Sequence, residues 1–264
     1  MNLMIAIILI FLVSLVMSVT GRGGGNFYVP ILIALGLSTY NAAATAQLIL
    51  TFSALAAMLV FHKSKMVDWK LALVLDPPTD IMAFVGGYYA HIFPENILKT
   101  IFAVLLVIAA FIMIVQPKNS IKYNRNRLGF WHREYGENSY TVNLWLAIPF
   151  TAAVGFIAGM VGISGGSFKV PLMVLVCGVP MQIAVGTSSA MVAATALMGF
   201  IGHAIGSNID ISNALILSST GVVGGITGSR LARNMKPRNL KRIFAYTTLA
   251  AAIFMFLNIW LTSN

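Results

Sequence analysis

Ten apolar segments recur along the chain, and they constrain its fold more than any other feature. A segment of about 20 apolar residues is long enough to cross the hydrocarbon core of a bilayer as an α-helix. Hydrophobic residues make up 58% of the chain and charged residues only 9%, so a soluble fold could not bury this much apolar surface. The alternating pattern of a membrane β-barrel is not found in the sequence. We therefore expect an all-α polytopic membrane protein.

The segments form two sets of five that are related as an internal repeat. The first half contains Gly21-Arg-Gly-Gly-Gly-Asn-Phe-Tyr-Val-Pro30, and the second contains Gly162-Ile-Ser-Gly-Gly-Ser-Phe-Lys-Val-Pro171. A glycine loop precedes the second segment of each half, which has only about a dozen residues and is too short for an unaided crossing. Similar spacing relates further pairs: Asp68 with Asp210, and Gly86 with Gly228. The expected segments are 2–20, 27–37, 40–61, 69–91 and 96–116 in the first half, and 142–160, 168–178, 182–206, 212–232 and 239–261 in the second.

The repeat divides the chain into residues 1–116, a first transmembrane repeat, and residues 141–264, a second transmembrane repeat. Residues 117–140 between them are polar and charged, which predicts a solvated cytoplasmic linker. Each repeat is expected to hold four long helices and one short helix that starts at the glycine loop. The short helices either cross the membrane or re-enter it.

Basic residues are distributed unevenly over the loops. Lysines and arginines concentrate after the third segment of the first half, in the linker, and after the fourth segment of the second half. The equivalent loops of the opposite halves, 204–211 and 91–96, carry no basic residue. Because loops rich in lysine and arginine stay in the cytoplasm, equivalent loops face opposite sides of the membrane. We expect two inverted-topology repeats, with both termini outside and the linker inside.

Two basic residues are candidates for a buried substrate site. Arg22 lies in the first glycine loop and Lys169 lies beside the second. A charge at membrane depth is costly and is usually functional. Alternatively, each side chain could reach an interface and have no role in binding.

The glycine loops favour binding of an anion. A helix start offers free N–H groups and the positive end of the helix dipole, and inverted repeats would aim two such starts at one central site. Asn26 and Ser167 precede the short helices and are suitable N-cap residues. The alternative is that the glycines only permit close helix packing. The loop residues assigned to the substrate are Arg22, Gly23, Gly24, Gly25, Asn26, Ser164, Gly165, Gly166, Ser167 and Lys169.

The third segment of each half begins with small and polar residues. Thr45 and Gln47 in the first half, and Thr187 and Ser188 in the second, could donate hydrogen bonds to a polar substrate. They could equally hold neighbouring helices together.

Asp76 and Asp80 lie within the fourth segment of the first half, in Leu75-Asp-Pro-Pro-Thr-Asp80. Carboxylates inside a membrane often carry protons or bind sodium, so this pair is expected to couple transport to an ion. The two prolines are expected to break the helix and to free carbonyl groups. The alternative is a structural ion pair with Arg22.

The paired glycine loops with Phe-x-Val-Pro, the Gly-Thr-Ser at 186–188 and Val67-Asp68-Trp69 resemble the sulfite exporter TauE/SafE family. The resemblance covers nearly the whole chain and implies a multi-pass transporter of the cell (inner) membrane, with sulfite or an organosulfonate as its substrate. Our hypothesis is a secondary transporter that works by alternating access. The resemblance also places the substrate at residues 21–26 and 162–167. The segment around Asp76 and Asp80 departs from the family, in which this region is usually apolar and small.

Two other functions are compatible with parts of the sequence. Gly162-Ile-Ser164-Gly165 fits the Gly-x-Ser-Gly pattern of an intramembrane serine protease, with His203 as a base. However, Gly23 stands where the second repeat has Ser164, so the repeat explains the loop without catalysis, and we do not expect an enzyme. The other alternative is a carrier of a lipid-linked phosphate or of another carboxylate or phosphate anion.

Few partners are expected besides the substrate. With Cys177 as its single cysteine, the chain can form no internal disulfide and no cysteine metal site, and we expect no cofactor. The net charge of +10 is explained by the basic loops, so we expect no nucleic acid. The expected partners are a small anion and the lipid bilayer, and a homodimer is compatible with the sequence.

Overall fold

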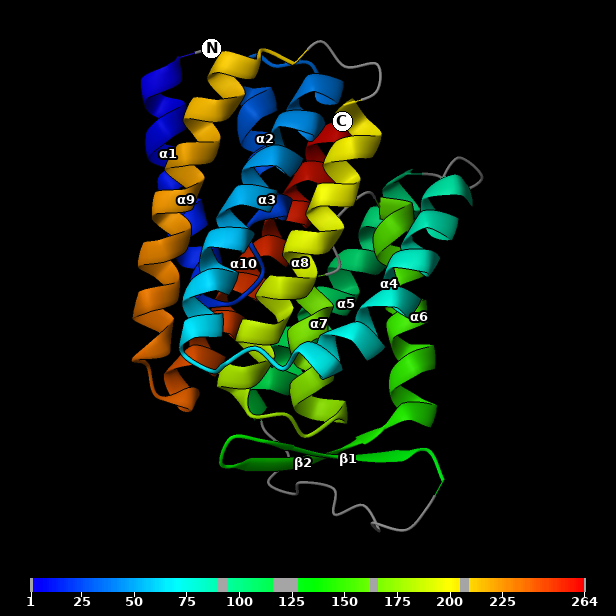
Figure 1. Cartoon of the computed structure of the whole chain (residues 1–264). Helices are drawn as coiled ribbons and strands as arrows, with labels where there is room; N and C mark the ends of the chain where they lie inside the picture. Colours follow the sequence, from blue (N-terminus) through cyan, green and yellow to red (C-terminus); the bar gives the residue numbers. More distant parts are fainter. Residues whose placement is uncertain (1, 90–94, 116–127, 162–165, 205–208, 264) are drawn as a thin grey trace. The chain divides into compact units, whose positions relative to one another are not determined.

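The computed structural model describes residues 2–89, 95–115, 128–161, 166–204 and 209–263 (Figure 1). Within these ranges all ten apolar segments form helices, in the expected order and close to the expected boundaries. The helices of the first half are α1 (Leu3–Val19), α2 (Gly25–Ala34), α3 (Thr39–Lys63), α4 (Trp69–Tyr89) and α5 (Glu95–Val115). Those of the second half are α6 (Leu144–Val161), α7 (Gly166–Pro171) with a π-helical turn (Leu172–Val176), α8 (Met181–Ala204), α9 (Ile211–Arg233) and α10 (Pro237–Ser263).

Length and composition suit several of these helices to a bilayer. Among the described residues, four helical stretches are long and apolar enough to cross a membrane: 41–63, 181–201, 211–233 and 237–257. The second helix of each half is short, as the sequence indicates. At about 1.5 Å per residue, α2 spans only about 15 Å, half of a hydrocarbon core.

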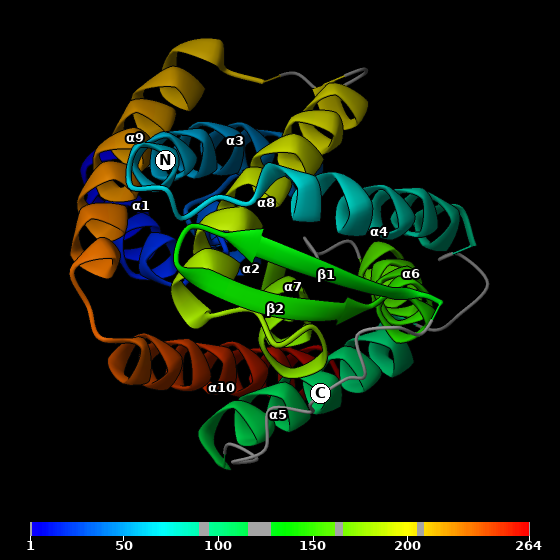
Figure 2. The same ribbon diagram turned by 60° about the horizontal axis from the view of Figure 1, so that its bottom comes forward.

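A β-hairpin departs from the expected all-α fold. Strands β1 (Phe130–Tyr135) and β2 (Asn138–Asn143) pair antiparallel and occupy part of the segment expected to be a solvated linker (Figure 2). Tyr135 pairs with Asn138, so the turn consists of Gly136 and Glu137. Gly136 has a φ of 60°, a conformation that favours glycine. Aromatic and β-branched residues on both sides of this glycine are the strand signal that the overall polarity of the linker conceals.

The chain forms two compact units, and each contains helices from both sequence halves. Unit 1 comprises residues 1–67 and 185–235, with α1, α2, α3, most of α8 and α9. Unit 2 comprises residues 68–184 and 236–264, with α4, α5, the hairpin, α6, α7 and α10. The two predicted transmembrane repeats are the two halves of the sequence. The compact units are a different division of the chain, because each unit combines helices from both halves.

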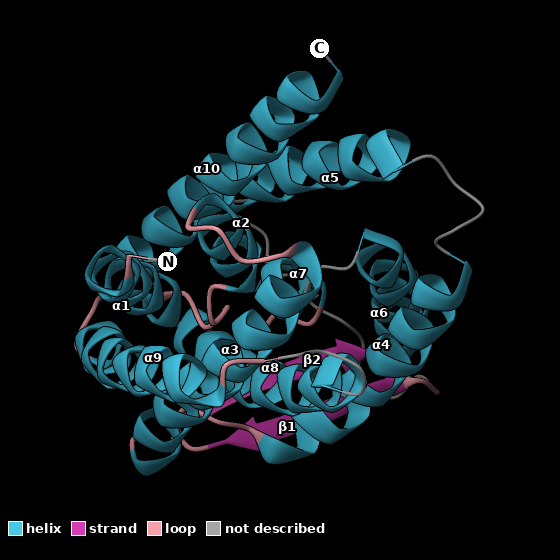
Figure 3. Cartoon of the chain, turned by 90° about the horizontal axis from the view of Figure 1, so that it is seen from above, coloured by secondary structure: helices cyan, strands magenta, loops and turns pink. Residues whose placement is uncertain are grey.

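In unit 1, α1 packs along α9, and the two helices lie side by side in Figures 1 and 3. The Ser14 hydroxyl donates a hydrogen bond to the carbonyl oxygen of Gly221 at 2.7 Å. Further along both helices, a Cβ built at Gly228 would overlap the carbonyl oxygen of Leu15. The two helices therefore run in the same direction, and the glycines let their backbones approach closely.

Helix α3 also follows α9 in the same direction. A Cβ at Gly221 would lie 3.1 Å from the Cγ2 atom of Ile49, and one at Gly225 would overlap the backbone of Ser53. Helices α1 and α3 are both parallel to α9. The short helix α2, which connects them, therefore runs in the opposite direction. Helices α1 and α2 thus form a hairpin with the first glycine loop at its tip.

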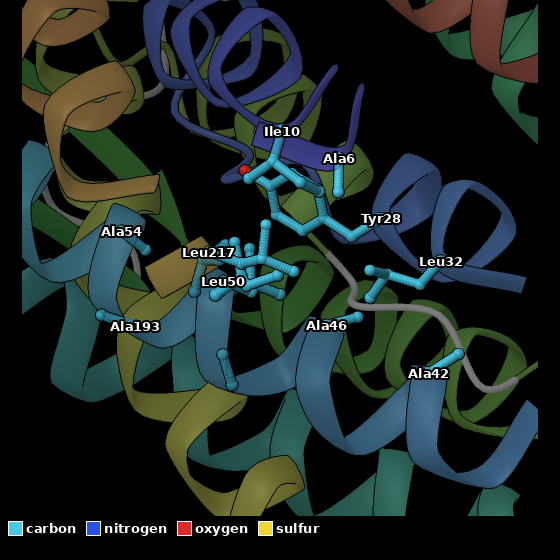
Figure 4. Packing of buried hydrophobic residues seen from close by; sticks show 13 residues of the cluster. Ala6, Ile10, Tyr28, Leu32, Ala42, Ala46, Leu50, Ala54, Ala193 and Leu217 are labelled. Atoms are coloured by element: carbon cyan, nitrogen blue, oxygen red, sulfur yellow. The ribbon is translucent and has the colours of Figure 1, made fainter. Parts of the chain in front are cut away.

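The apolar core of unit 1 surrounds this helical hairpin. Tyr28 and Leu32 of α2 are fully buried and pack with Ile10 of α1, Leu50 of α3 and Leu217 of α9 (Figure 4). Burial of such side chains stabilises a fold by about 1.5–3 kcal/mol each in water. This packing fixes the position of the glycine loop from which α2 begins.

In unit 2, α4 packs on α6 and α5 packs on α10 (Figure 3). A Cβ at Gly86 would overlap the carbonyl oxygen of Phe156, and one at Gly155 would overlap that of Thr79. The α4–α6 contact is therefore a close backbone contact, as in the α1–α9 pair of unit 1.

The two close contacts occupy equivalent places in the repeat. Leu15 lies six residues before Gly21, and Phe156 lies six residues before Gly162. Their carbonyl groups meet Gly228 and Gly86, which the repeat also pairs. In both units, then, the first helix of one half packs on the fourth helix of the other half.

Helix starts repeat in the same way. The Asp68 carboxylate accepts hydrogen bonds from the backbone N–H groups of Lys70 and Leu71 and caps α4. Asp210 caps α9 by accepting from the N–H of Asn213. Both are N-cap aspartates at positions that the repeat pairs.

Candidate functional site

The first glycine loop adopts a conformation that requires glycine. Gly21, Gly23 and Gly24 have φ values of 71°, 71° and 94°, in the left-handed region that other residues rarely adopt. A Cβ at Gly21 would also overlap the carbonyl oxygen of Val185 in α8. Helix α2 begins at Gly25, so Gly24 is its N-cap. The expected N-cap Asn26 instead lies in the first turn of the helix.

Arg22 lies between Gly21 and Gly23 in this loop. Its side chain is buried, with 3% of the residue exposed, and its Nε donates a hydrogen bond to the Thr20 hydroxyl at 3.2 Å. Little of the side chain is therefore accessible to solvent. A buried guanidinium is a strong site for an anion, because it is always charged and carries five donors in a planar fork.

Several polar atoms of unit 1 are buried without a hydrogen-bond partner among the described residues. Among the residues assigned to the substrate, these include Gln47 Oε1 and Ser188 Oγ. Ser18 Oγ of α1 and Ser218 Oγ of α9 are further examples, which sequence reasoning missed. Buried polar groups are nearly always paired, so these atoms mark places where water or a polar ligand would bind. Thr45 and Thr187 are also buried in this unit.

Unit 2 contains a buried ion pair between α7 and α4. The Nζ atom of Lys169 lies 2.5 Å from Oδ1 of Asp76 and 4.0 Å from Oδ1 of Asp80. Lys169 and Asp76 are buried, and Asp80 is half-buried. The structure thus brings together three of the residues selected from the sequence. The structural ion pair considered for Asp76 has Lys169, rather than Arg22, as its observed partner.

The prolines beside Asp76 do not end the helix. Helix α4 runs from Trp69 to Tyr89 with Pro77 and Pro78 inside it, contrary to the expected break. A proline has no N–H, so the carbonyl groups of Leu73 and Val74, four residues earlier, lose their usual helical donors. Helix α4 packs on α6 along this stretch, where Thr79 lies against Gly155.

A small cavity borders the Lys169 side chain. Its volume is about 10 Å³, which is room for roughly one water molecule. It is too small for an anion such as sulfite, so Lys169 and Asp76 form a closed pair in this structure. The lining residues are Thr79, Phe150, Thr151, Val154, Phe168, Lys169 and Leu172.

The second glycine loop is described only in part. Gly166 and Ser167 are the first residues of α7 and are buried, so Ser167 lies inside the helix rather than at its N-cap. Ser164 and Gly165 lie outside the described residues, as does any serine-protease geometry built on Ser164. No group of histidine, cysteine and acidic residues in the described part of the chain could hold a metal ion.

A polar cluster that sequence reasoning missed joins the hairpin to α4. Arg133 of β1 donates two hydrogen bonds to the Asp68 carboxylate, at 2.6 and 3.1 Å, and the Tyr140 hydroxyl of β2 donates a third. Burial alone would raise the pKa of Asp68, but the hydrogen bonds from Arg133 and Tyr140 lower it below 3.8. The guanidinium also lies 5.1 Å from the centre of the Trp131 ring. The cluster could not be predicted from the sequence, because Asp68 lies far along the chain from Arg133 and Tyr140.

The chain is similar to a known protein family and to individual proteins over nearly its whole length. A family model described as "Sulfite exporter TauE/SafE" matches residues 6–255. "Probable membrane transporter protein YunE" of Bacillus subtilis is 27% identical over 256 residues, which cover 92% of this chain and 93% of that protein. "Probable membrane transporter protein YjnA" of the same organism is 26% identical over 249 residues, or 91% of this chain and 94% of that protein.

A plant protein is similar over a shorter stretch. "Sulfite exporter TauE/SafE family protein 5" of Arabidopsis thaliana is 28% identical over 130 residues, which cover 48% of this chain and 27% of that protein. No solved structure matches the chain.

Proposed function

Since the chain belongs to the sulfite exporter TauE/SafE family of membrane transporters, we propose that it is a secondary carrier of a small anion, with sulfite or an organosulfonate as its substrate. The family description supports this substrate class. The relatives YunE and YjnA are named as transporters, which favours transport over the protease alternative on Ser164 and His203.

Buried positive charge supports an anionic substrate. Arg22 in unit 1 and Lys169 in unit 2 are each about 3% exposed, and each lies at or beside one of the two glycine loops. A buried cation is stable only when it is paired or hydrogen-bonded. An anion that replaces the present partner at either cation would meet that requirement.

The single observation that carries the proposal is the contact between Lys169 and Asp76. While the Asp76 carboxylate is ionised, it holds the ammonium that an anionic substrate would need. Protonation of Asp76 would weaken this pair and leave the ammonium to bind the anion. When the substrate leaves, Asp76 would release its proton on the same side of the membrane and pair with Lys169 again. Anion and proton would therefore cross the membrane together.

Asp80 strengthens the argument for a coupled cation. Two carboxylates lie within 4.0 Å of one ammonium. Carboxylates at membrane depth are costly to keep ionised and often carry protons. A proton shared by Asp76 and Asp80, or a sodium ion near Asp80, would lower that cost.

Inverted repeats would supply alternating access. The uneven distribution of basic loops supports inversion, and the equivalent contacts of Gly86 with Phe156 and Gly228 with Leu15 support the repeat. The hairpin formed by α1 and α2 would be a re-entrant element with its glycine loop inside the membrane. Three crossings per half would then remain, which gives the odd number that inversion requires.

Transport by the purified protein in liposomes tests the proposal. We expect saturable uptake of sulfite or a short sulfonate under an imposed proton gradient, and its loss in Arg22→Ala and in Lys169→Gln. Lys70→Gln removes an exposed lysine next to the same cluster of helices and is the matched control. Uptake that persists in both site variants would refute the assigned site. A wild-type protein that moves none of these anions would refute the proposed substrate.

A further inference from the structure

A groove in unit 2 combines three cations of one helix with apolar side chains of its neighbour. Arg238, Lys241 and Arg242 come from the first turns of α10, and Met113 and Ile114 come from the last turn of α5. Figure 2 shows these two helices side by side. The groove has a volume of about 740 Å³, within the usual range for a small-molecule site. Pro237 and Tyr246 complete its lining.

The three cations are unfavourable for the helix that carries them. Arg238, Lys241 and Arg242 are three and four residues apart, so they lie on one face of α10 and repel one another. They also lie at the positive end of the helix dipole, and the first turn of α10 contains no acidic residue to offset them. A bound anion would relieve both effects. The positive-inside rule accounts for basic residues near this helix start, but it does not require them to line one groove.

The apolar part of the groove, which both helices contribute, suits a hydrocarbon chain. Ile114 is 52% exposed and Tyr246 is 64% exposed, although both belong to largely apolar helices. Tyrosine is common at the level of lipid headgroups, where its ring meets hydrocarbon and its hydroxyl meets water. The groove therefore offers cations to a phosphate and apolar side chains to the glycerol and the upper acyl chain.

We propose that this groove binds the headgroup of an anionic glycerophospholipid from the cytoplasmic leaflet. The assignment to that leaflet rests on the proposed transporter topology, in which the orientation expected from the basic loops places the basic start of α10 inside. Basic pockets between transmembrane helices on that side hold anionic headgroups. A free phosphate ion shares the negative charge, but it has no acyl chain to contact Ile114 and Tyr246.

Lipid binding to the full-length protein in detergent tests the inference. We would titrate phosphatidylglycerol, and phosphatidylcholine with the same acyl chains, and count bound lipids by native mass spectrometry. We expect at least a fivefold preference for phosphatidylglycerol and a rise in the thermal unfolding midpoint with that lipid only. Both effects should be lost in the triple variant Arg238→Gln, Lys241→Gln, Arg242→Gln. The exposed Arg242→Gln change alone should give a partial loss, which keeps the test valid if the triple variant folds poorly.

A second triple variant controls for net charge. Lys63→Gln, Lys65→Gln, Lys70→Gln removes the same number of positive charges from exposed positions outside the groove, and it should keep the lipid preference. An equal loss in both triple variants would overturn the inference, as would equal binding of phosphatidylcholine. An equal stabilisation by inorganic phosphate would assign the groove to a free anion instead and would also overturn it. Lipid preference in a protein that transports no sulfite would refute the proposed substrate and support the lipid site.

Discussion

The ammonium of Lys169 on α7 lies 2.5 Å from the carboxylate of Asp76 on α4, inside unit 2. The second glycine loop leads into α7, and the two prolines of α4 follow Asp76 directly. The contact therefore joins α4, next to its two prolines, to the short helix α7, which continues into a π-helical turn. A helix with missing hydrogen-bond donors is easier to bend, so a change at this ion pair could be transmitted to the shape of α4.

The ion pair should show strong coupling in a double-mutant cycle. Lys169→Gln leaves the Asp76 carboxylate buried without its cation, and removing one partner of a buried pair typically costs about 3–5 kcal/mol. Adding Asp76→Asn removes the unpaired charge, so the double variant should be more stable than Lys169→Gln alone. Thermal unfolding of the four proteins in one detergent measures the coupling.

Asp80→Asn serves as the control for this cycle. Asp80 lies 4.0 Å from the same ammonium and is half-buried, so its loss should cost less than about 1 kcal/mol. A double variant no more stable than Lys169→Gln would show that Asp76 and Lys169 do not depend on each other.

Replacing a glycine at a helix–helix contact by alanine should destabilise the protein by an amount that depends on the atoms that the new methyl group would meet. Gly228→Ala places a methyl group against the backbone carbonyl of Leu15, which cannot move away, and should cost about 1–3 kcal/mol. Gly86→Ala should cost a similar amount, because it meets Phe156 in the equivalent way. The measurement is the thermal unfolding midpoint of each variant.

Gly221→Ala is the matched control in α9. Its methyl group would lie 3.1 Å from the Cγ2 atom of Ile49, a side-chain atom that can shift, so the destabilisation should be smaller. If Gly221→Ala lowers the midpoint as much as Gly228→Ala, contact with the backbone is not the reason for these glycines.

Much of the helical order was predictable because each helix is a local property of the sequence. Apolar runs between polar loops indicate where α3, α9 and α10 begin and end, and the glycine loops indicate where the short helices α2 and α7 start. The paired aspartates Asp68 and Asp210 act as equivalent caps, which the repeat spacing suggests. In each case the information lies within a few residues of the element.

Contacts between distant segments were less predictable. The sequence selected Asp76 and Lys169 as separate candidates, but only the packing of α7 against its neighbours shows that they pair. The hairpin was missed because charged residues hide its alternation, and its anchor at Asp68 joins two segments far apart in the chain. Such pairings depend on packing, which a single sequence does not display.

The Asp68 cluster should make the anchoring of the hairpin dependent on pH. Hydrogen bonds from Arg133 and Tyr140 lower the pKa of Asp68 below its ordinary value of 3.8. The stabilisation is therefore complete above pH 3.8 and is lost as the pH falls through the lowered pKa. Asp68→Asn should cost about 1.5–3 kcal/mol at pH 7, and its difference from the wild type should shrink below pH 3.8. Thermal unfolding of both proteins from pH 7 to pH 3 measures this convergence.

Asp210→Asn separates this effect from helix capping. Asp210 caps α9 and accepts a hydrogen bond from the side chain of Asn213, and asparagine is itself a good N-cap residue. The variant should therefore lie within about 1 kcal/mol of the wild type at pH 7. A constant difference between wild type and Asp68→Asn over the whole pH range would show that the carboxylate charge does not anchor the hairpin.

The proposed orientation predicts opposite labelling of two surface positions. The turn residue Glu137 lies within the expected cytoplasmic linker, so a cysteine there should react with a membrane-impermeant maleimide only in inside-out vesicles. Ile211 is 68% exposed at the start of α9, next to a loop without basic residues, and a cysteine there should react only in right-side-out vesicles. The native Cys177 is buried and should give little background. Labelling of both positions from the same side would contradict the inverted repeats, because these positions would then share one face of the membrane.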